Sequence, residues 1–164
     1  MGNGMVRKVD ELGRVVIPKE MRRILNIKTG SSIEMIIDDD NQVVLKKFSE
    51  LENISSVIES LVKTIYDFYN IPCFVCDDDK ILVVCGLPKK EFLYKKIRSL
   101  SNKKNQTTLK EVLEGVEDNS TCFVFSVITD GFDCGKLVLI GEMTNEQICS
   151  INVLVKFVCS ILKF

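Results

Sequence analysis

The first 48 residues alternate short apolar runs with turn residues. Apolar residues at positions 5, 6 and 9 predict a short strand, and the β-branched run at 14–17 predicts a second strand. The turn between them, at 10–13, ends in a glycine that can adopt a positive φ. Pro18 lacks a backbone N–H, so it suits the start of a helix over 19–25, whose apolar face comprises Met21, Ile24 and Leu25.

The next pattern predicts a hairpin with an acidic tip. Two apolar runs, at 32–37 and 42–47, flank a turn that contains three consecutive aspartates. A calcium loop needs alternating oxygen ligands and a terminal glutamate, and this turn has neither. We therefore interpret residues 38–41 as a solvated hairpin turn rather than a metal site.

Residues 49–70 form the longest periodic segment. Ser49 and Glu52 form a capping box that starts a helix. Apolar residues then recur at spacings of three and four, as in a heptad seam: Leu51, Ile54, Ile58, Leu61, Ile65 and Phe68. A second apolar stripe widens this face, and a helix with two apolar faces usually has two partners. We expect one partner to be its own domain and the other the same helix of another subunit, with two core-facing stripes as the alternative.

The pattern beyond residue 70 mixes strands with helices. We predict strands at 73–76, 81–85, 121–128 and 136–140, and helices at 89–100, at 108–114 and from residue 144 to the C-terminus. This order is typical of an α+β fold with an antiparallel sheet and helices packed against it. About 115 residues suffice for one hydrophobic core, so we divide the chain into residues 1–48 and 49–164, with 49–70 as a linking helix.

Charge is distributed unevenly along the chain. Residues 1–28 hold seven Lys or Arg and three acidic residues, a net charge of +4, whereas residues 49–164 carry a net charge of −3. Arginine provides a planar, permanently charged fork that suits phosphate groups. The alternative is a solvated basic face with surface salt bridges to Glu11 and Glu20.

The N-terminal segment resembles a known family. The runs VRKVDELGRVVIPKEMRRILNI and GSSIEMIIDDDNQVVLKKFS are similar to the DNA-binding domain of the AbrB family of bacterial transition-state regulators. The resemblance implies a swapped-hairpin dimer whose basic residues contact DNA, here Arg7, Lys8, Arg14, Arg22 and Arg23. Because strands and a very short helix would form this surface, we expect readout of DNA shape and a preference for A·T-rich double-stranded DNA.

The size of this segment also predicts a dimer. A domain of about 45 residues buries too little surface to be stable without a disulfide, a metal or a partner. The segment has no cysteine and the whole chain has no histidine, so we expect a homodimer through residues 1–48.

Residues 49–164 resemble a GAF-type sensor domain by their order of elements. That resemblance implies a pocket for an unidentified small-molecule effector. The combination of the two domains resembles regulators of sporulation and of other transition-state genes. We expect a homotetramer that assembles through the helix at 49–70.

Other function classes find less support. Cys73 and Cys76 form the only close cysteine pair, and three-residue spacing on a strand directs the two thiols to opposite faces. We therefore expect structural thiols and no metal or other cofactor, with a redox- or metal-responsive regulator as an alternative. No catalytic motif is present, so we expect no enzyme. A second alternative is an antitoxin, although an apolar, folded C-terminal region argues against a disordered toxin-binding tail. No signal peptide or apolar run of about 18 residues is present, which predicts a cytoplasmic protein without a membrane anchor.

Overall fold

The computed structural model describes residues 4–98, 105–129 and 131–161. The chain divides into two compact units, Met1–Phe48 and Ser49–Phe164, which are described separately below. We call them unit 1 and unit 2.

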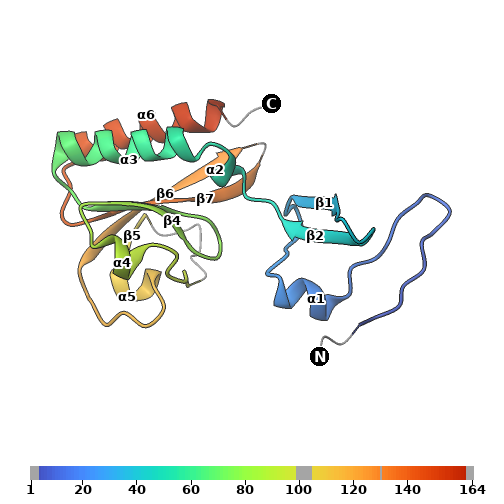
Figure 1. The fold of residues 1–164 in the computed structure, drawn as a ribbon. Coiled ribbons are helices and arrows are strands. Elements are labelled where there is room, and N and C mark those ends of the chain that lie inside the picture. Colours follow the sequence, from blue (N-terminus) through green and yellow to red (C-terminus); the bar gives the residue numbers. More distant parts are fainter. Residues whose placement is uncertain (1–3, 99–104, 130, 162–164) are drawn as a thin grey trace. The chain divides into compact units, whose positions relative to one another are not determined.

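Unit 1 contains one short helix and one hairpin (Figure 1). Helix α1 (Lys19–Ile24) follows Pro18 directly, and strands β1 (Ile33–Ile37) and β2 (Val43–Lys47) pair antiparallel. The predicted helix and hairpin are therefore confirmed. The Asp38 carboxylate stabilises the acidic tip, because it accepts hydrogen bonds from the backbone N–H groups of Asp40 and Gln42 at 3.0 and 2.8 Å.

The predicted strands at 5–9 and 14–17 do not form within one chain. Residues 4–18 instead make an open, extended loop around a tight turn (Figure 1). Asp10 closes the turn with a backbone hydrogen bond to the Arg14 carbonyl at 3.0 Å, and Gly13 has a φ of +75°. A strand needs a neighbouring strand to satisfy its backbone groups, and a single copy of unit 1 offers none here.

Unit 1 has almost no interior of its own. Among residues 4–48, Pro18 is the only buried residue. Large apolar side chains stay exposed along the open loop, α1 and the hairpin: Met5, Val6, Val9, Leu12, Val15, Val16, Met21, Ile24, Leu25, Met35, Ile37 and Val43. A stable folded domain rarely leaves this much apolar surface in water.

Unit 2 is built on a five-stranded antiparallel sheet (Figure 1). Its strands are β3 (Cys73–Cys76), β4 (Ile81–Cys85), β5 (Gln106–Thr108), β6 (Thr121–Thr129) and β7 (Phe132–Ile140), in the spatial order β4-β3-β7-β6-β5. Because side chains alternate along each strand, the sheet supports one apolar core on each face. The predicted mixed fold, with a sheet and packed helices, is confirmed.

Two long helices cover one face of this sheet. Helix α3 (Ser55–Tyr69) and helix α6 (Asn145–Ile161) pack on β3, β6 and β7. Asn70 ends α3 in the left-handed conformation with a φ of +51°. The predicted capping box of α6 is confirmed, because Thr144 and Gln147 exchange backbone-to-side-chain hydrogen bonds at 2.9 and 3.3 Å.

The opposite face carries shorter elements than predicted. The helix expected at 89–100 is only α4 (Lys89–Phe92), because Leu93 is extended and Tyr94 has a φ of +64°. The chain then runs beside β4, where the Ile81 N–H donates to the Lys95 carbonyl at 3.0 Å. Helix α5 (Leu109–Val112) likewise makes a single turn, and Thr108 precedes it without a side-chain cap. Part of the predicted 89–100 helix lies outside the described residues.

The linking helix at 49–70 is not continuous. It breaks at Ile54 into α2 (Glu50–Asn53) and α3, and Ser49 caps α2 by accepting the Glu52 N–H at 3.4 Å. The Cys134 thiol, on β7, donates to the Glu50 carboxylate at 2.8 Å. This hydrogen bond joins α2 to β7, which are far apart in the sequence.

The heptad seam also needs correction as an oligomerisation surface. Leu51, Ile58 and Ile65 are 1% exposed or less, because they pack into the core of unit 2. Ile54 and Leu61 are partly buried against the same core, and Phe68 is 79% exposed. Only the outer part of the predicted seam therefore remains available to a second subunit.

Candidate nucleic-acid interface and effector pocket

The five predicted DNA-contacting residues all lie on the surface of unit 1. Arg7 and Lys8 belong to the open loop before the turn, Arg14 follows the turn, and Arg22 and Arg23 lie in the last turn of α1. All five side chains are exposed. Within the described residues, the structure gives no ion-pair partner to Arg7, Lys8, Arg22 or Arg23. Salt bridges to Glu11 and Glu20 therefore do not account for these charges.

Arg14 differs from the other four because it organises the turn. Its Nε donates to the Asp10 carboxylate at 2.7 Å, while its backbone N–H donates to the same side chain at 2.8 Å. These hydrogen bonds hold the pKa of the Asp10 carboxyl below its usual value. The Arg14 side chain is still 70% exposed. Asp10 thus orients a guanidinium group that remains largely open to solvent.

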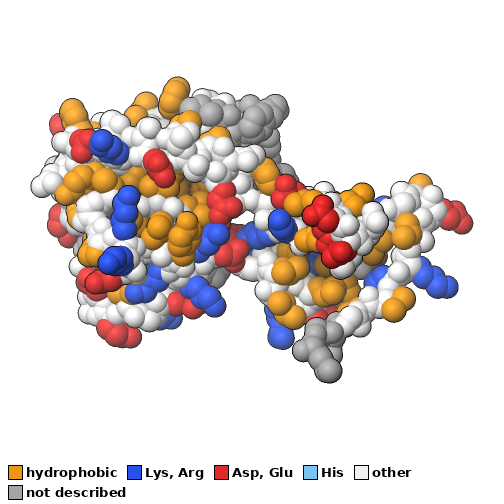
Figure 2. Space-filling model, viewed as in Figure 1, with side chains coloured by type: hydrophobic (Ala, Val, Ile, Leu, Met, Phe, Trp, Pro, Cys, Tyr) orange, Lys and Arg blue, Asp and Glu red, His pale blue; other side chains and the backbone are white. Residues whose placement is uncertain are grey.

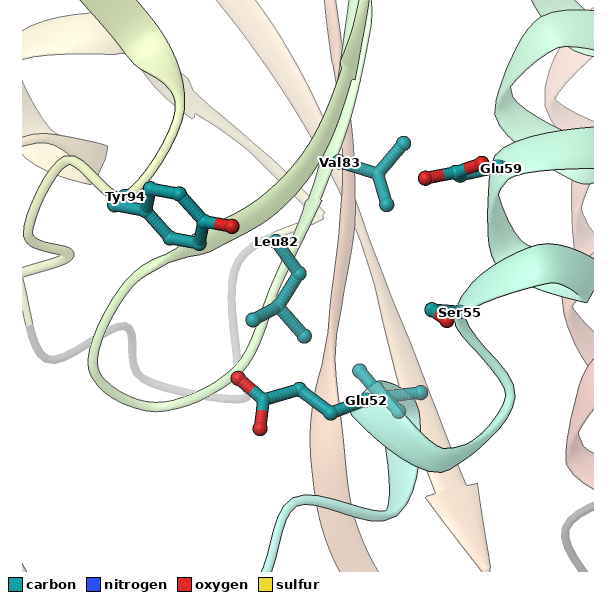
Figure 3. Close-up of a pocket in the computed structure, with 7 residues that line it drawn as sticks. Glu52, Ser55, Glu59, Leu82, Val83 and Tyr94 are labelled. Carbon is teal, nitrogen blue, oxygen red and sulfur yellow. The ribbon is translucent and has the colours of Figure 1, made fainter.

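Unit 2 contains an open cavity of about 330 Å³ between α2, α3 and β4. Leu82 and Val83 of β4 supply apolar lining, while Glu52, Ser55 and Glu59 supply polar groups from α2 and α3. Figure 3 shows the Tyr94 ring directed toward Leu82, with the glutamates on the side of the helices. Cavities of this size can hold a small ligand.

A cation contacts two of the residues that line the cavity. The Lys80 ammonium pairs with the Glu52 carboxylate at 2.8 Å and lies 5.6 Å from the centroid of the Tyr94 ring. The hydrogen bond to Glu52 raises the pKa of Lys80. Because Lys80 offsets the charge of Glu52, Glu59 supplies the excess negative charge of the cavity.

Sequence reasoning assigned none of the lining residues to a ligand site, and it named Leu51 and Glu52 only for the heptad seam and the capping box. The lining residues come from α2, α3, β4 and the segment after α4, and no short motif connects them. Only the tertiary structure shows that these residues line one cavity.

Three of the seven cysteines, Cys73, Cys76 and Cys122, are buried, whereas Cys149 is exposed. Cys73 lies in the core beneath α3 and α6, whereas Cys76 lies in the core on the other face, which confirms the predicted opposite orientations. Burial raises the pKa of Cys73 to about 12 and raises the pKa of Cys76 further. The described part of the chain contains no cluster of His, Cys, Asp or Glu that could hold a metal ion. In that same part, no helix is both long and apolar enough to cross a bilayer.

Comparison with known proteins places the N-terminal unit in a class. Residues 6–49 match the family model described as antidote-toxin recognition MazE, bacterial antitoxin. The same region is 56% identical, over 45 residues, to transition state regulatory protein AbrB of Bacillus subtilis (strain 168), covering 27% of this chain and 46% of AbrB. Unit 1 is therefore a domain of the AbrB/MazE type.

A second relative extends the similarity over both units. Across 149 residues the chain is 30% identical to stage V sporulation protein T of Bacillus subtilis (strain 168), which covers 85% of this chain and 84% of that protein. The chain belongs to the stage V sporulation protein T family.

Proposed function

We propose that this protein is a DNA-binding transcription regulator of sporulation or other transition-state genes. The observation that carries the proposal is the group of exposed cations on unit 1, on a domain that resembles AbrB over the same residues. Fixed positive charge without protein partners suits the phosphate backbone of DNA.

The DNA-binding form would be a swapped-hairpin dimer of unit 1. Residues 4–18 present extended backbone to solvent and leave side chains such as Val6, 93% exposed, without cover. The same loop of a second copy could pair with this backbone and bury these apolar groups. Dimerisation would also double the number of cations on one assembly.

Within that dimer, Arg7, Lys8, Arg14, Arg22 and Arg23 would contact phosphates and groove edges. Helix α1 spans six residues, too short to act as a long recognition helix. Recognition would depend on DNA shape and on backbone contacts, with A·T-rich duplexes preferred because their narrow minor groove attracts arginine.

The test is the affinity of single variants for duplex DNA at several salt concentrations. Arg14→Ala and Arg23→Ala should weaken binding, and each lost phosphate contact should reduce the slope of log affinity against log salt by about 0.9. Lys63→Ala is the matched control, because Lys63 is an exposed cation on α3 of unit 2. Unchanged binding by both arginine variants would refute the assignment.

Assembly into a tetramer would use the outer face of α3 and α6. Phe68 is 79% exposed on α3, and Val153 and Phe157 are 67% and 62% exposed on α6. These side chains would pack against the same face of a second dimer. Phe68→Asp combined with Phe157→Asp should halve the sedimentation mass of the assembly, while a tetramer that persists would exclude this face.

An effector of the GAF-like unit would bind in the cavity beside Glu59. The apolar lining of Leu82 and Val83 and the excess negative charge favour a small amine with an apolar body. A thermal-shift screen of primary amines should show stabilisation of the wild type and a weaker effect on Glu59→Gln. Equal shifts for both proteins would argue against this cavity.

An antitoxin is the second candidate, because the family model that matches residues 6–49 is described as a bacterial antitoxin. Unit 2 argues against it, since it is a folded domain with its own core. Purification of the chain from its host, followed by mass spectrometry, distinguishes the two. A stoichiometric toxin-like partner would favour the antitoxin.

A further inference from the structure

Positive charge within unit 2 is concentrated in one segment. Residues 80–110 contain nine Lys or Arg and one acidic residue, Glu91, for a net charge of +8. The remainder of unit 2 contains four basic and fifteen acidic residues, for a net charge of −11. The small net charge of the unit therefore conceals two strongly charged regions of opposite sign.

One described cation of this segment, Lys80, pairs with Glu52. The other six belong to α4, α5 and the segment between them, and we call them the α4 basic face: Lys89, Lys90, Lys95, Lys96, Arg98 and Lys110. All are exposed except Lys95, which is half-buried. Figure 2 shows Lys and Arg side chains gathered over α4 on unit 2.

Backbone hydrogen bonds hold these residues together. The Arg98 N–H donates to the Val112 carbonyl at 2.8 Å, and the Glu114 N–H donates to the Lys96 carbonyl at 3.1 Å. The Arg98 Nε also donates to the Leu113 carbonyl at 3.0 Å. The segment after α4 is thereby fixed beside the end of α5, the helix that carries Lys110.

The acidic residues of this region form no ion pair with the α4 basic face. Within the described residues, no ion pair involves any of the six cations. Carboxylates do occur on the same elements, with Glu91 on α4, Glu111 on α5, and Glu114, Glu117 and Asp118 after α5. Exposed cations without an ion-pair partner remain available to a polyanionic partner.

We propose that the α4 basic face contacts the phosphate backbone of DNA, as a second contact surface in addition to unit 1. This inference rests on the proposed function, because unit 1 would hold DNA at high local concentration near unit 2. Five of the six cations are lysines, which act as point charges on flexible stems. The face would therefore add affinity and salt dependence without reading sequence.

The test compares full-length variants on one long duplex by fluorescence anisotropy at several salt concentrations. Lys89→Gln combined with Lys96→Gln should reduce the log affinity–log salt slope by about two units and weaken binding at least about tenfold at moderate salt. Lys63→Gln removes an exposed cation of α3 outside the α4 basic face, and this control should leave the slope unchanged. Lys89→Arg combined with Lys96→Arg keeps the charge and should bind as the wild type does.

The outcomes separate this inference from the proposed function. If the Lys89/Lys96 glutamine variant keeps the wild-type slope while Arg14→Ala loses affinity, unit 1 binds DNA and the α4 basic face does not. A loss per charge in Lys63→Gln equal to that in the α4 variant would show a general charge effect and overturn the inference. A lower sedimentation mass at an unchanged slope would instead make the face a contact with acidic residues of another copy. Unchanged binding by Arg14→Ala and Arg23→Ala would refute the function assigned to unit 1, whatever the α4 variants do.

Discussion

Val15 offers a direct test of the missing interior of unit 1. It is 53% exposed and follows Arg14 in the open loop. In a strand that pairs with a second copy, side chains alternate, so Val15 would face away from the Arg14 surface and into the dimer core. Val15→Asp should therefore disrupt the dimer while leaving the cationic surface in place.

The size of the effect follows from the part of the Val15 side chain that is exposed in one copy and that dimerisation would bury. Full burial of a valine side chain contributes about 2 kcal/mol, so the exposed half contributes about 1 kcal/mol per copy and about 2 kcal/mol per dimer. At 1.4 kcal/mol per decade, the dimer dissociation constant should rise by a factor of about 30. Burial of the aspartate charge makes this a lower estimate.

Sedimentation equilibrium over a range of protein concentrations measures this constant, and limited proteolysis within residues 4–18 reports the opening of the loop. Thr29→Asp is the control, since Thr29 is an exposed polar residue in a turn of the same unit. If Val15→Asp has the same dimer dissociation constant and the same cleavage rate as the control, Val15 stays in solvent. That result would refute the interleaved dimer.

Three further outcomes follow from unit 2. Burial raises the pKa of Cys73 and Cys122 to about 12, from a usual value of 9.0, so the unfolded state loses these protons first. The contribution of these two thiols to the free energy of unfolding, measured by denaturant titration, should therefore be fully present below pH 9. Above pH 9 the free energy of unfolding should fall by at most about 1.4 kcal/mol per pH unit for each thiol. Gly135→Ala should lower the unfolding free energy by about 2 kcal/mol in the same assay, because its Cβ would meet the Cys76 carbonyl and the Leu51 side chain. Chelators and mild oxidants should leave DNA affinity unchanged in anisotropy measurements, and a large reversible change would favour a redox-responsive regulator.

Local signals in the sequence predicted the local elements well. Pro18 before α1, the acidic turn before β2 and the Thr144 capping box each specify a structure through nearby backbone groups. Such signals act within four residues, so no tertiary information is needed. The helix predicted at 89–100 failed because hydrogen bonds to β4 and α5 compete with helical ones, and those partners are distant in the sequence.

The role of the seam at Leu51–Phe68 in assembly stays a prediction, and periodicity alone could not decide which partner the seam meets. Spacings of three and four place side chains on one helical face, but the spacing is the same whether that face meets a sheet or another helix. Leu51, Ile58 and Ile65 meet the sheet of unit 2, which sequence periodicity alone could not distinguish from a coiled coil. Phe68 belongs to the same heptad series, but its side chain is exposed to solvent rather than buried against the sheet.

The two units differ in how they obtain their stability, and this difference explains why they occur in one chain. Unit 2 buries its own core, whereas unit 1 leaves its apolar residues exposed. In the proposed dimer, folding of unit 1 would be coupled to its association and would become more favourable as the local concentration of a second copy rises. The proposed self-association of unit 2 through α3 and α6 would raise that concentration. A ligand or substitution that weakens association of unit 2 would therefore reduce DNA binding by destabilising the fold of unit 1, even if no DNA-contacting residue changes.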